Sequence, residues 1–384
     1  MKNNKLSLGI DTSNYTTSVA LTGFGGEIIK DLRKPLQVKQ GERGLRQSHA
    51  LFQHIENLPG LLEEILDSPL RMEIKAVSAS DRPRRAEGSY MPVFNGGCRF
   101  GKVAAAALGV PFFCFSHQEG HLAAAVHGTA LAGRFSGAAD ALPTGGGLET
   151  AATVNFEAEA GSEAAAAGAF RAGGAREIPR EPAQSGFLAW HLSGGTCELL
   201  RVDQNRISIL GGTKDLSFGQ LIDRVGVAMG LSFPCGGELD RLALRASQRF
   251  IGEMEKPLSS QEGRRIRPVK NPLKAIPVDG LAFNASGIET QAQRSLDQLA
   301  PEDAAFFIFQ RIEECLIQVT QAACRQEDRH QILFMGGVAA SACLRAGLER
   351  SLAAKGIEAV FGQRALSSDN GVGISLLGGQ ALWR

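Results

Sequence analysis

The sequence predicts an α/β fold of two similarly built lobes. Each half of the chain opens with short apolar strands that double back on one another, and each then alternates helices with strands. Glycine, serine or aspartate residues occupy the first tight turn of each half, where the two halves are expected to face each other. With 384 residues, the chain is long enough for two domains, each with its own core.

The elements of each half follow from hydrophobic periodicity and from turn residues. In the first half we expect strands at 6–11, 16–21, 74–79 and 110–116, and helices at 45–66, 96–108 and from 117 onward. In the second half we expect strands at 187–192, 198–202, 207–212, 331–335 and 357–361, and helices at 216–231, from 238, at 301–326, at 336–354 and at the C-terminus.

Between the halves, residues 128–185 are dominated by alanine, glycine and glutamate. Few side chains in this stretch are large enough to build a core, so we expect a low-complexity insertion that is poorly ordered or partly helical. We therefore assign residues 1–115, completed by the helix at 366–384, to an N-terminal lobe. The C-terminal lobe is expected at 116–127 and 186–365.

Composition and charge exclude several classes of protein. The net charge is +1, which gives no overall attraction to nucleic acid or membrane. Any RNA contact would come from a local patch such as the basic residues of 261–274, although a solvated loop explains such a patch more commonly. The seven cysteines form no C-x-x-C pair, which argues against disulfides and a thiolate zinc site and fits the cytoplasm. No secretory signal or membrane-spanning run is visible.

Two histidines point to a metal site. His117 and His121 follow a short apolar strand and precede a run of helix formers, with Ser116 in the place of an N-cap. Side chains four residues apart lie on one face of a helix, so the two imidazoles can share one metal ion. An exposed first turn is the simpler alternative. A zinc-protease motif is excluded, because it needs glutamate where this chain has Gln118.

The glycine-rich turns have the pattern of nucleotide-binding loops. The Asp11-Thr12-Ser13 turn places an acid and two hydroxyls at a hairpin tip, and Ser193-Gly194-Gly195 lets the backbone approach an anion closely. Gly336-Gly337 separates a strand from a helix, a geometry suited to phosphate or adenine. Each turn also has a purely structural explanation. Asp223, Gly237 and Asp240 surround one helix corner, where ribose binding and helix capping are about equally plausible.

Taken together, these pieces have the layout of the actin-like ATPase (ASKHA) fold, with two related lobes around a nucleotide cleft. At this level the chain resembles the TsaD family, formerly called O-sialoglycoprotein endopeptidases or glycoproteases. The co-linear motifs that carry the resemblance are Leu8-Gly-Ile-Asp-Thr-Ser13, His117-x-Glu-Gly-His121, Ser193-Gly-Gly-Thr196, Gly219-Gln-Leu-Ile-Asp223, Gly236-Gly-x-x-Asp240, Phe283-x-x-Ser-Gly287, Gly336-Gly-Val-Ala-Ala340 and Ser368-Asp-Asn370.

The resemblance implies an acyltransferase. Enzymes of this family transfer a threonylcarbamoyl group from threonylcarbamoyl-adenylate to the adenosine beside the anticodon of tRNA. The implied cofactors are one divalent metal, iron or zinc, and an adenine nucleotide. The implied partners are tRNA and accessory proteins of the same pathway, with no membrane.

The resemblance also assigns residues to roles. His117, His121 and Asp369 are implied as metal ligands, and Asp11 is expected to be catalytic. The implied substrate and nucleotide contacts are Ser13, Ser193, Gly194, Gly195, Thr196, Cys197, Asp223, Gly237, Asp240, Gly336, Gly337 and Ser341.

The chain departs from the family pattern mainly at these substrate contacts. The family's histidine after Ser-Gly-Gly is Thr196 here, its asparagine near the Gly-Gly-Val motif is Ser341, and its Gly-Pro-Gly segment is replaced by residues 81–90. The chain therefore resembles a divergent member. Two alternatives remain: a paralogue that binds nucleotide, metal and another carbamoyl-type substrate, or a non-catalytic regulatory subunit. A metallopeptidase is the least favoured.

Overall fold

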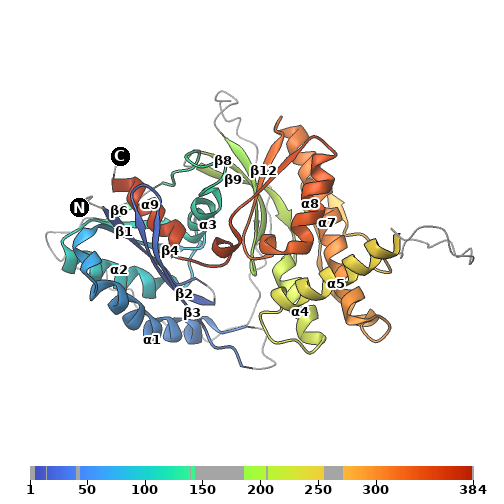
Figure 1. The fold of residues 1–384 in the computed structure, drawn as a ribbon, viewed down its shortest axis with the longest axis horizontal. Helices are drawn as coiled ribbons and strands as arrows, with labels where there is room; N and C mark the ends of the chain where they lie inside the picture. The colour runs from blue at the N-terminus through green and yellow to red at the C-terminus, as the bar shows by residue number, and fades with distance from the viewer. Residues whose placement is uncertain are drawn as a thin grey trace, which may run out of the picture.

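The computed structural model describes residues 5–13, 15–39, 44–138, 140–142, 186–204, 206–254 and 271–382. Within these residues the strands form one six-stranded and one seven-stranded sheet. Figure 1 shows the two sheets side by side, each covered by helices on its outer face. Most of the basic patch expected at 261–274 and most of the insertion expected at 128–185 lie outside the described residues.

The N-terminal sheet has the strand order β3-β2-β1-β4-β5-β6. The first three strands form an antiparallel meander, while β4 and β5 continue the sheet in parallel with β1. The short β6 comes from the segment expected as an insertion and pairs with β5. The bounds are β1 Leu6–Asp11, β2 Thr16–Gly23, β3 Ile28–Pro35, β4 Ile74–Arg82, β5 Phe112–Ser116 and β6 Asp140–Leu142.

The C-terminal sheet repeats this plan in the order β10-β11-β9-β8-β7-β12-β13. Here β7, β8 and β9 form the antiparallel meander, and β12 and β13 continue in parallel with β7. The repeated plan confirms the predicted two-lobed α/β fold. The bounds are β7 Phe187–Leu192, β8 Cys197–Asp203, β9 Arg206–Thr213, β10 Val278–Asp279, β11 Ala282–Phe283, β12 Gln331–Met335 and β13 Glu358–Phe361.

Most helices agree with the hydrophobic periodicity, but the helix α6 at Ser286–Ser295 was not expected and the start of one expected helix was wrong. The helix expected from Gly336 begins instead at Ala342, because Ser341 provides the N-cap by accepting a hydrogen bond from the Leu344 amide. A short 3₁₀ turn, η2 at Val338–Ala340, precedes it. The α-helices are α1 Gln47–Leu66, α2 Phe94–Leu108, α3 His117–Val126, α4 Phe218–Ala228, α5 Gly236–Met254, α6 Ser286–Ser295, α7 Pro301–Gln326, α8 Ala342–Ala353 and α9 Val372–Leu382.

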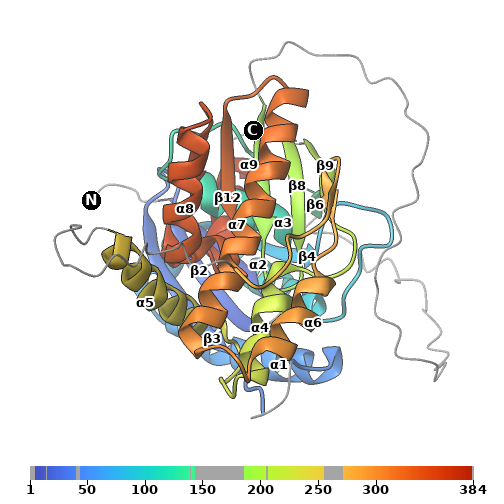
Figure 2. The same cartoon turned by 90° about the vertical axis from the view of Figure 1, so that its right-hand side faces the viewer.

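Two further 3₁₀ turns, η1 at Pro69–Glu73 and η3 at Arg364–Leu366, link helices to strands or turns. Figure 2 shows the long α7 lying along the outer face of the C-terminal sheet. Within the part of the chain that is described, no helix is both long and apolar enough to cross a membrane.

Helices α3 and α9 lie between the two sheets and share one apolar core. This core joins Phe115 of β5 and Leu122 of α3 to Leu333 of β12 and Ile374 of α9, all at most 1% exposed. Figure 1 places α3 centrally, with α9 against β1 and β4 of the N-terminal sheet. The two helices that connect the lobes are therefore the ones that bring distant parts of the chain together.

Helix α9 lies unusually close to the N-terminal sheet. A Cβ atom added at Gly9 would lie 2.3 Å from the Ser375 backbone nitrogen and 2.4 Å from the Gly371 oxygen, so only glycine allows this approach. The Ser375 hydroxyl donates to the Ser7 carbonyl at 2.6 Å, and the Gly371 amide donates to the Ser18 hydroxyl at 2.7 Å. These contacts fix the loop that leads into α9.

Candidate metal centre and nucleotide loops

The sequence between β5 and α3 places two histidines on one helical turn. Ser116 ends β5 and forms a capping box with Glu119: its hydroxyl accepts from the Glu119 amide, and the Glu119 carboxylate accepts from the Ser116 amide. This confirms the expected N-cap. The His117 and His121 rings then lie 4.4 Å apart between centroids, and both side chains are buried.

The loop before α9 brings Asp369 to this pair. Its Oδ1 lies 3.4 Å from His117 Nε2 and 3.3 Å from His121 Nε2. These three residues offer ligand atoms that all lie within 4.8 Å of one another, and among the described residues they form the single group of this kind. The structure therefore brings together the three residues that the sequence proposes as metal ligands.

The donor set fits a divalent metal of the iron or zinc type. Two imidazoles and one carboxylate are ligands that such metals accept, and three protein ligands leave a coordination position free. His117 Nε2 is buried and has no hydrogen-bond partner. On the other side of the ring, Nδ1 lies 3.1 Å from Asp11 Oδ2, so a proton on Nδ1 leaves the Nε2 lone pair for a metal.

The Asp11 carboxylate contacts the His117 ring and is shielded from solvent. Its carboxylate is 1% exposed and also accepts hydrogen bonds from the hydroxyls of Ser13, at 2.9 Å, and Ser80, at 2.5 Å. A carboxylate behind a ligating imidazole orients the ring and raises its basicity. The geometry thus gives Asp11 a positioning role, and Ser13 supports that carboxylate. Ser80 was not foreseen, because a serine within a buried strand has no distinguishing pattern.

Opposed charges set the protonation of this cluster in the absence of metal. Burial lowers the pKa of His117, but Asp11 and Asp369 outweigh it and raise the pKa to about 10. Burial and the neighbouring His117 lower the pKa of His121. Burial raises the pKa of Asp369, yet its contacts with both histidines bring that pKa below its usual value. At neutral pH His117 is thus the one proposed ligand that must lose a proton before a metal binds.

Glu119 has no access to a substrate. Its side chain is 1% exposed, accepts from the amides of Ser116 and Ala138 at 2.8 and 2.9 Å, and pairs with Arg85 at 3.0 Å. A general base for peptide hydrolysis must reach a water molecule beside the metal. The contacts of Glu119 leave it a structural role at the start of α3.

The Ser193-Gly-Gly turn joins β7 to β8 as an open hairpin tip. Gly194 and Gly195 are exposed, and a Cβ atom added at either would meet no other atom within 4 Å, although the Gly194 carbonyl accepts from the Ser217 hydroxyl at 2.7 Å. The Thr196 amide donates to the Ser193 hydroxyl at 3.1 Å. By contrast, the Cys197 side chain is 1% exposed within the core of the C-terminal lobe. The expected contact at Cys197 is therefore limited to its backbone.

The expected ribose carboxylates have partners within the protein. Asp240 accepts from the Ser341 hydroxyl at 2.5 Å and from the amides of Ala342 and Cys343 at 2.9 and 3.1 Å, which holds the N-terminus of α8. Asp223 accepts from the Cys235 amide at 2.8 Å. Both side chains are partly exposed, so their structural bonds do not seal them from solvent. Ribose binding by Asp223 and Asp240 stays a prediction.

The Gly336–Gly337 loop lies next to the Ser193–Gly194–Gly195 turn. Gly336 has φ +95°, and a Cβ there would lie 2.4 Å from the Leu192 carbonyl oxygen, next to the Ser193 turn. Gly337 is exposed, and Gly237 lies exposed in the first turn of α5. Through the Asp240–Ser341 hydrogen bond, α5 is tied to the loop that Gly336 and Gly337 begin. The implied nucleotide loops of the C-terminal lobe therefore form one surface.

A further histidine lies beside the metal ligands and was not foreseen. His191, near the end of β7, is 2% exposed, and its ring centroid lies 5.0 Å from that of His121. Gln118 Nε2 lies 3.5 Å from His191 Nδ1 and donates to Glu198 at 2.9 Å. Arg84 forms an ion pair with the same glutamate. A histidine within an otherwise apolar buried strand was the available signal.

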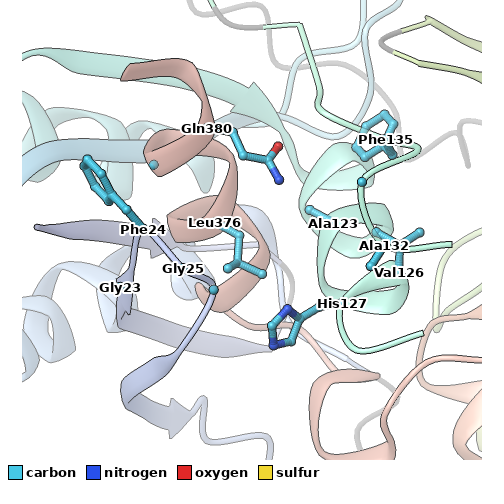
Figure 3. A pocket seen from close by; sticks show the side chains of 13 residues that line it. Gly23, Phe24, Gly25, Ala123, Val126, His127, Ala132, Phe135, Leu376 and Gln380 are labelled. Carbon is cyan, nitrogen blue, oxygen red and sulfur yellow. The ribbon is translucent and has the colours of Figure 1, made fainter. Parts of the chain in front are cut away.

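A separate cavity lies away from these residues. Figure 3 shows it between the β2–β3 turn, the end of α3 and α9, where Phe24, His127 and Gln380 line about 190 Å³. None of the predicted site residues lines it. We assign it no role in the chemistry of the candidate metal centre.

Comparison with known proteins identifies the family of this chain. The family model for TsaD, tRNA N6-adenosine threonylcarbamoyltransferase, matches residues 175–376, which is more than half of the chain. A protein of that name from Thermus thermophilus is 28% identical over 380 residues, covering 98% of this chain and 92% of its own. One from Verminephrobacter eiseniae is 30% identical over 384 residues, covering 97% and 90%.

Solved structures resemble the chain more distantly. HypF from T. kodakarensis covers 99% of this chain and 48% of its own, at 12% identity and a TM-score of 0.46. Component A of an Acidaminococcus fermentans (R)-2-hydroxyglutaryl-CoA dehydratase covers 99% of both chains, at 11% identity and a TM-score of 0.47. With the family model and the relatives, the assignment is direct: the chain belongs to the TsaD family of tRNA N6-adenosine threonylcarbamoyltransferases, which are acyl-type transferases.

Proposed function

We propose that this protein transfers a threonylcarbamoyl group from threonylcarbamoyl-adenylate to the adenosine beside the anticodon of tRNA, in the cytoplasm and with accessory proteins of that pathway. The observation that carries the proposal is the junction of His117, His121 and Asp369 from two distant parts of the chain. Relatives named for threonylcarbamoyl transfer match the chain over nearly its whole length.

In the proposed reaction, the exocyclic nitrogen of adenosine bonds to the carbamoyl carbon. The bond from that carbon to the adenylate phosphate oxygen breaks, AMP leaves, and the nitrogen loses a proton. His117, His121 and Asp369 would hold the metal, which would supply a Lewis acid for a carbonyl or phosphoryl oxygen. Asp11 holds the His117 ring in the ligating orientation, as its 3.1 Å contact with Nδ1 indicates.

In the Ser193–Thr196 turn and the Gly336–Gly337 loop, the exposed backbone of Gly194, Gly195 and Gly337 is suited to the adenylate. Exposed N–H groups at a tight turn attract anionic oxygens without a charged side chain. We propose that these two loops hold the nucleotide, with Asp223 and Gly237 near the ribose. The N-terminal lobe, at 1–115 with the helix at 366–384, then contributes Asp11 and Asp369 to the cleft.

A second candidate is a paralogue that binds nucleotide and metal but uses another carbamoyl-type substrate. The observation that favours it comes from the residue after the Ser193–Thr196 turn: the thiol of Cys197 faces the core and cannot contact a substrate. A regulatory subunit without turnover is the third candidate. Peptide hydrolysis is disfavoured because Glu119 is buried and fully engaged.

The deciding experiment is a transfer assay with threonylcarbamoyl-adenylate and purified tRNA, with and without candidate accessory proteins. The wild-type protein and the control His127→Ala, whose histidine ends α3 outside the metal centre, are expected to modify tRNA. His117→Ala is expected to lose the activity. Binding of nucleotide and metal without tRNA product, accessory proteins included, would favour the paralogue. Absence of both kinds of binding would favour the regulatory subunit.

A further inference from the structure

His191 contributes a buried polar atom with no partner next to the metal centre. Its Nε2 has no hydrogen-bond partner and almost no exposed surface. Leaving such a group unpaired costs free energy, and one in a native structure calls for an explanation. The ring lies beside His121, at 5.0 Å between centroids, so the unpaired nitrogen belongs to a side chain that borders the proposed metal ligands.

The neighbours of His191 determine which nitrogen carries the proton. Glu198 can only accept a hydrogen bond, so the part of the Gln118 amide that faces it, at 2.9 Å, is the NH₂ group. The same NH₂ group lies 3.5 Å from His191 Nδ1, where it can donate but not accept. Nδ1 is therefore the acceptor nitrogen, and the proton of the neutral ring resides on Nε2.

Arg84 strengthens this arrangement by pairing with Glu198, which holds that carboxylate in place beside Gln118. Because Nδ1 accepts a hydrogen bond from Gln118, the ring carries a single N–H proton, on Nε2. It presents one N–H donor, oriented by an Arg84–Glu198–Gln118 chain of contacts.

Direct coordination by His191 is disfavoured on two grounds. Its nitrogens do not join the group of ligand atoms that lie within 4.8 Å of one another. A ligating Nε2 also needs its proton on Nδ1 and an acceptor beyond it. Gln118 offers a donor at that position. His117 shows the opposite arrangement, because Asp11 accepts from its Nδ1.

We propose that His191 is a neutral hydrogen-bond donor whose Nε2–H binds an anionic oxygen, phosphoryl or carboxylate, of the molecule held beside His117, His121 and Asp369. This proposal rests on the metal site of the proposed function. It adds a residue for substrate binding that lies outside the metal ligands and outside the glycine loops. The buried N–H of His191 then has a hydrogen-bond partner only when that molecule is bound.

The first test measures the tautomer of His191 by ¹⁵N NMR in the full-length protein, with His191→Gln used to assign the signal. The wild type is expected to carry the proton on Nε2. Gln118→Glu, which replaces the donor by an acceptor, is expected to move it to Nδ1. A wild-type ring protonated on Nδ1 would overturn the proposal without any need for a variant to fold.

The second test measures binding of zinc, and then of inorganic phosphate or acetate to the zinc-loaded protein. His191→Phe is expected to keep its zinc affinity within about threefold and to bind phosphate or acetate at least about tenfold more weakly. His191→Gln, which retains an N–H near the same place, is expected to restore much of that binding. Phosphate and acetate show which class of oxygen is recognised.

Two results would overturn the proposal in this test: a tenfold loss of zinc affinity in His191→Phe, which would make His191 a ligand, or unchanged affinity for both anions. Failure of the proposed function is separately visible. If the wild type binds zinc and anions as expected but transfers nothing to tRNA, the role of His191 stands while the tRNA activity is rejected.

Discussion

Metal binding to this protein is expected to depend steeply on pH, because the metal must displace a proton from His117. In the metal-free protein the pKa of His117 is raised to about 10, whereas ligation requires the neutral ring. The pKa of His121 is lowered and that of Asp369 is lowered, so neither takes part in a proton exchange near neutral pH. One proton should therefore leave for each metal that binds.

The magnitude follows from the distance between the pKa and the working pH. At pH 7 the proton weakens apparent metal affinity by a factor of about 1,000, and each unit of increasing pH removes about tenfold of this penalty until the pH reaches the pKa of His117. Affinity for zinc is expected to rise by about 100-fold between pH 7 and pH 9.

The assay is a competition titration of zinc against a chromophoric chelator at pH 7, 8 and 9, corrected for protonation of the chelator. Calorimetry in two buffers with different ionisation enthalpies counts the protons released at pH 7.5. His127→Ala is the control and is expected to keep the wild-type slope, since its histidine lies outside the cluster. A flat affinity from pH 7 to 9, or release of no proton, would refute the reasoning.

Three further predictions concern the surroundings of the metal ligands. Asp11→Asn is expected to flatten the pH dependence in the same titration, because loss of the carboxylate charge lowers the pKa of His117; an unchanged slope would contradict the role given to Asp11. Gly9→Ala is expected to cost about 3 kcal/mol in denaturant unfolding and to weaken zinc binding, because its Cβ would meet the Ser375 backbone; normal zinc affinity would separate the site from α9 docking. Trp190→Phe removes the hydrogen bond to Thr320, so we expect about 1–3 kcal/mol of destabilisation by the same method with zinc affinity retained.

Much of the fold and the metal centre was predictable, because local patterns encode both. The strand at 331–335 and the helix at 301–326 have the expected bounds, since apolar spacing and a Pro301 start are sufficient signals. The Ser116 cap and the four-residue spacing placed His117 and His121 on one turn. Asp369 came from the family resemblance, since no local pattern links it to residues 248 positions earlier.

The remaining features depend on packing between distant elements. The spacing of Asp240 indicated an acid at a helix corner, but not that α8 would use both of its oxygens. Cys197 begins a strand whose alternate residues face the core, so the strand periodicity already indicated that its side chain is buried. A histidine in an apolar strand marked His191 as unusual, but its position beside His121 depends on the packing of β7 against α3, which the local sequence does not reveal.

The close packing of α9 on the N-terminal sheet has a consequence for when a metal could bind to the protein in the cell. During synthesis, His117 and His121 leave the ribosome well before Asp369, which follows His121 by 248 residues. Until α9 docks through Gly9 and Ser375, the nascent chain offers an incomplete chelate. A metal that needs all three side chains is therefore expected to bind only after the chain has folded.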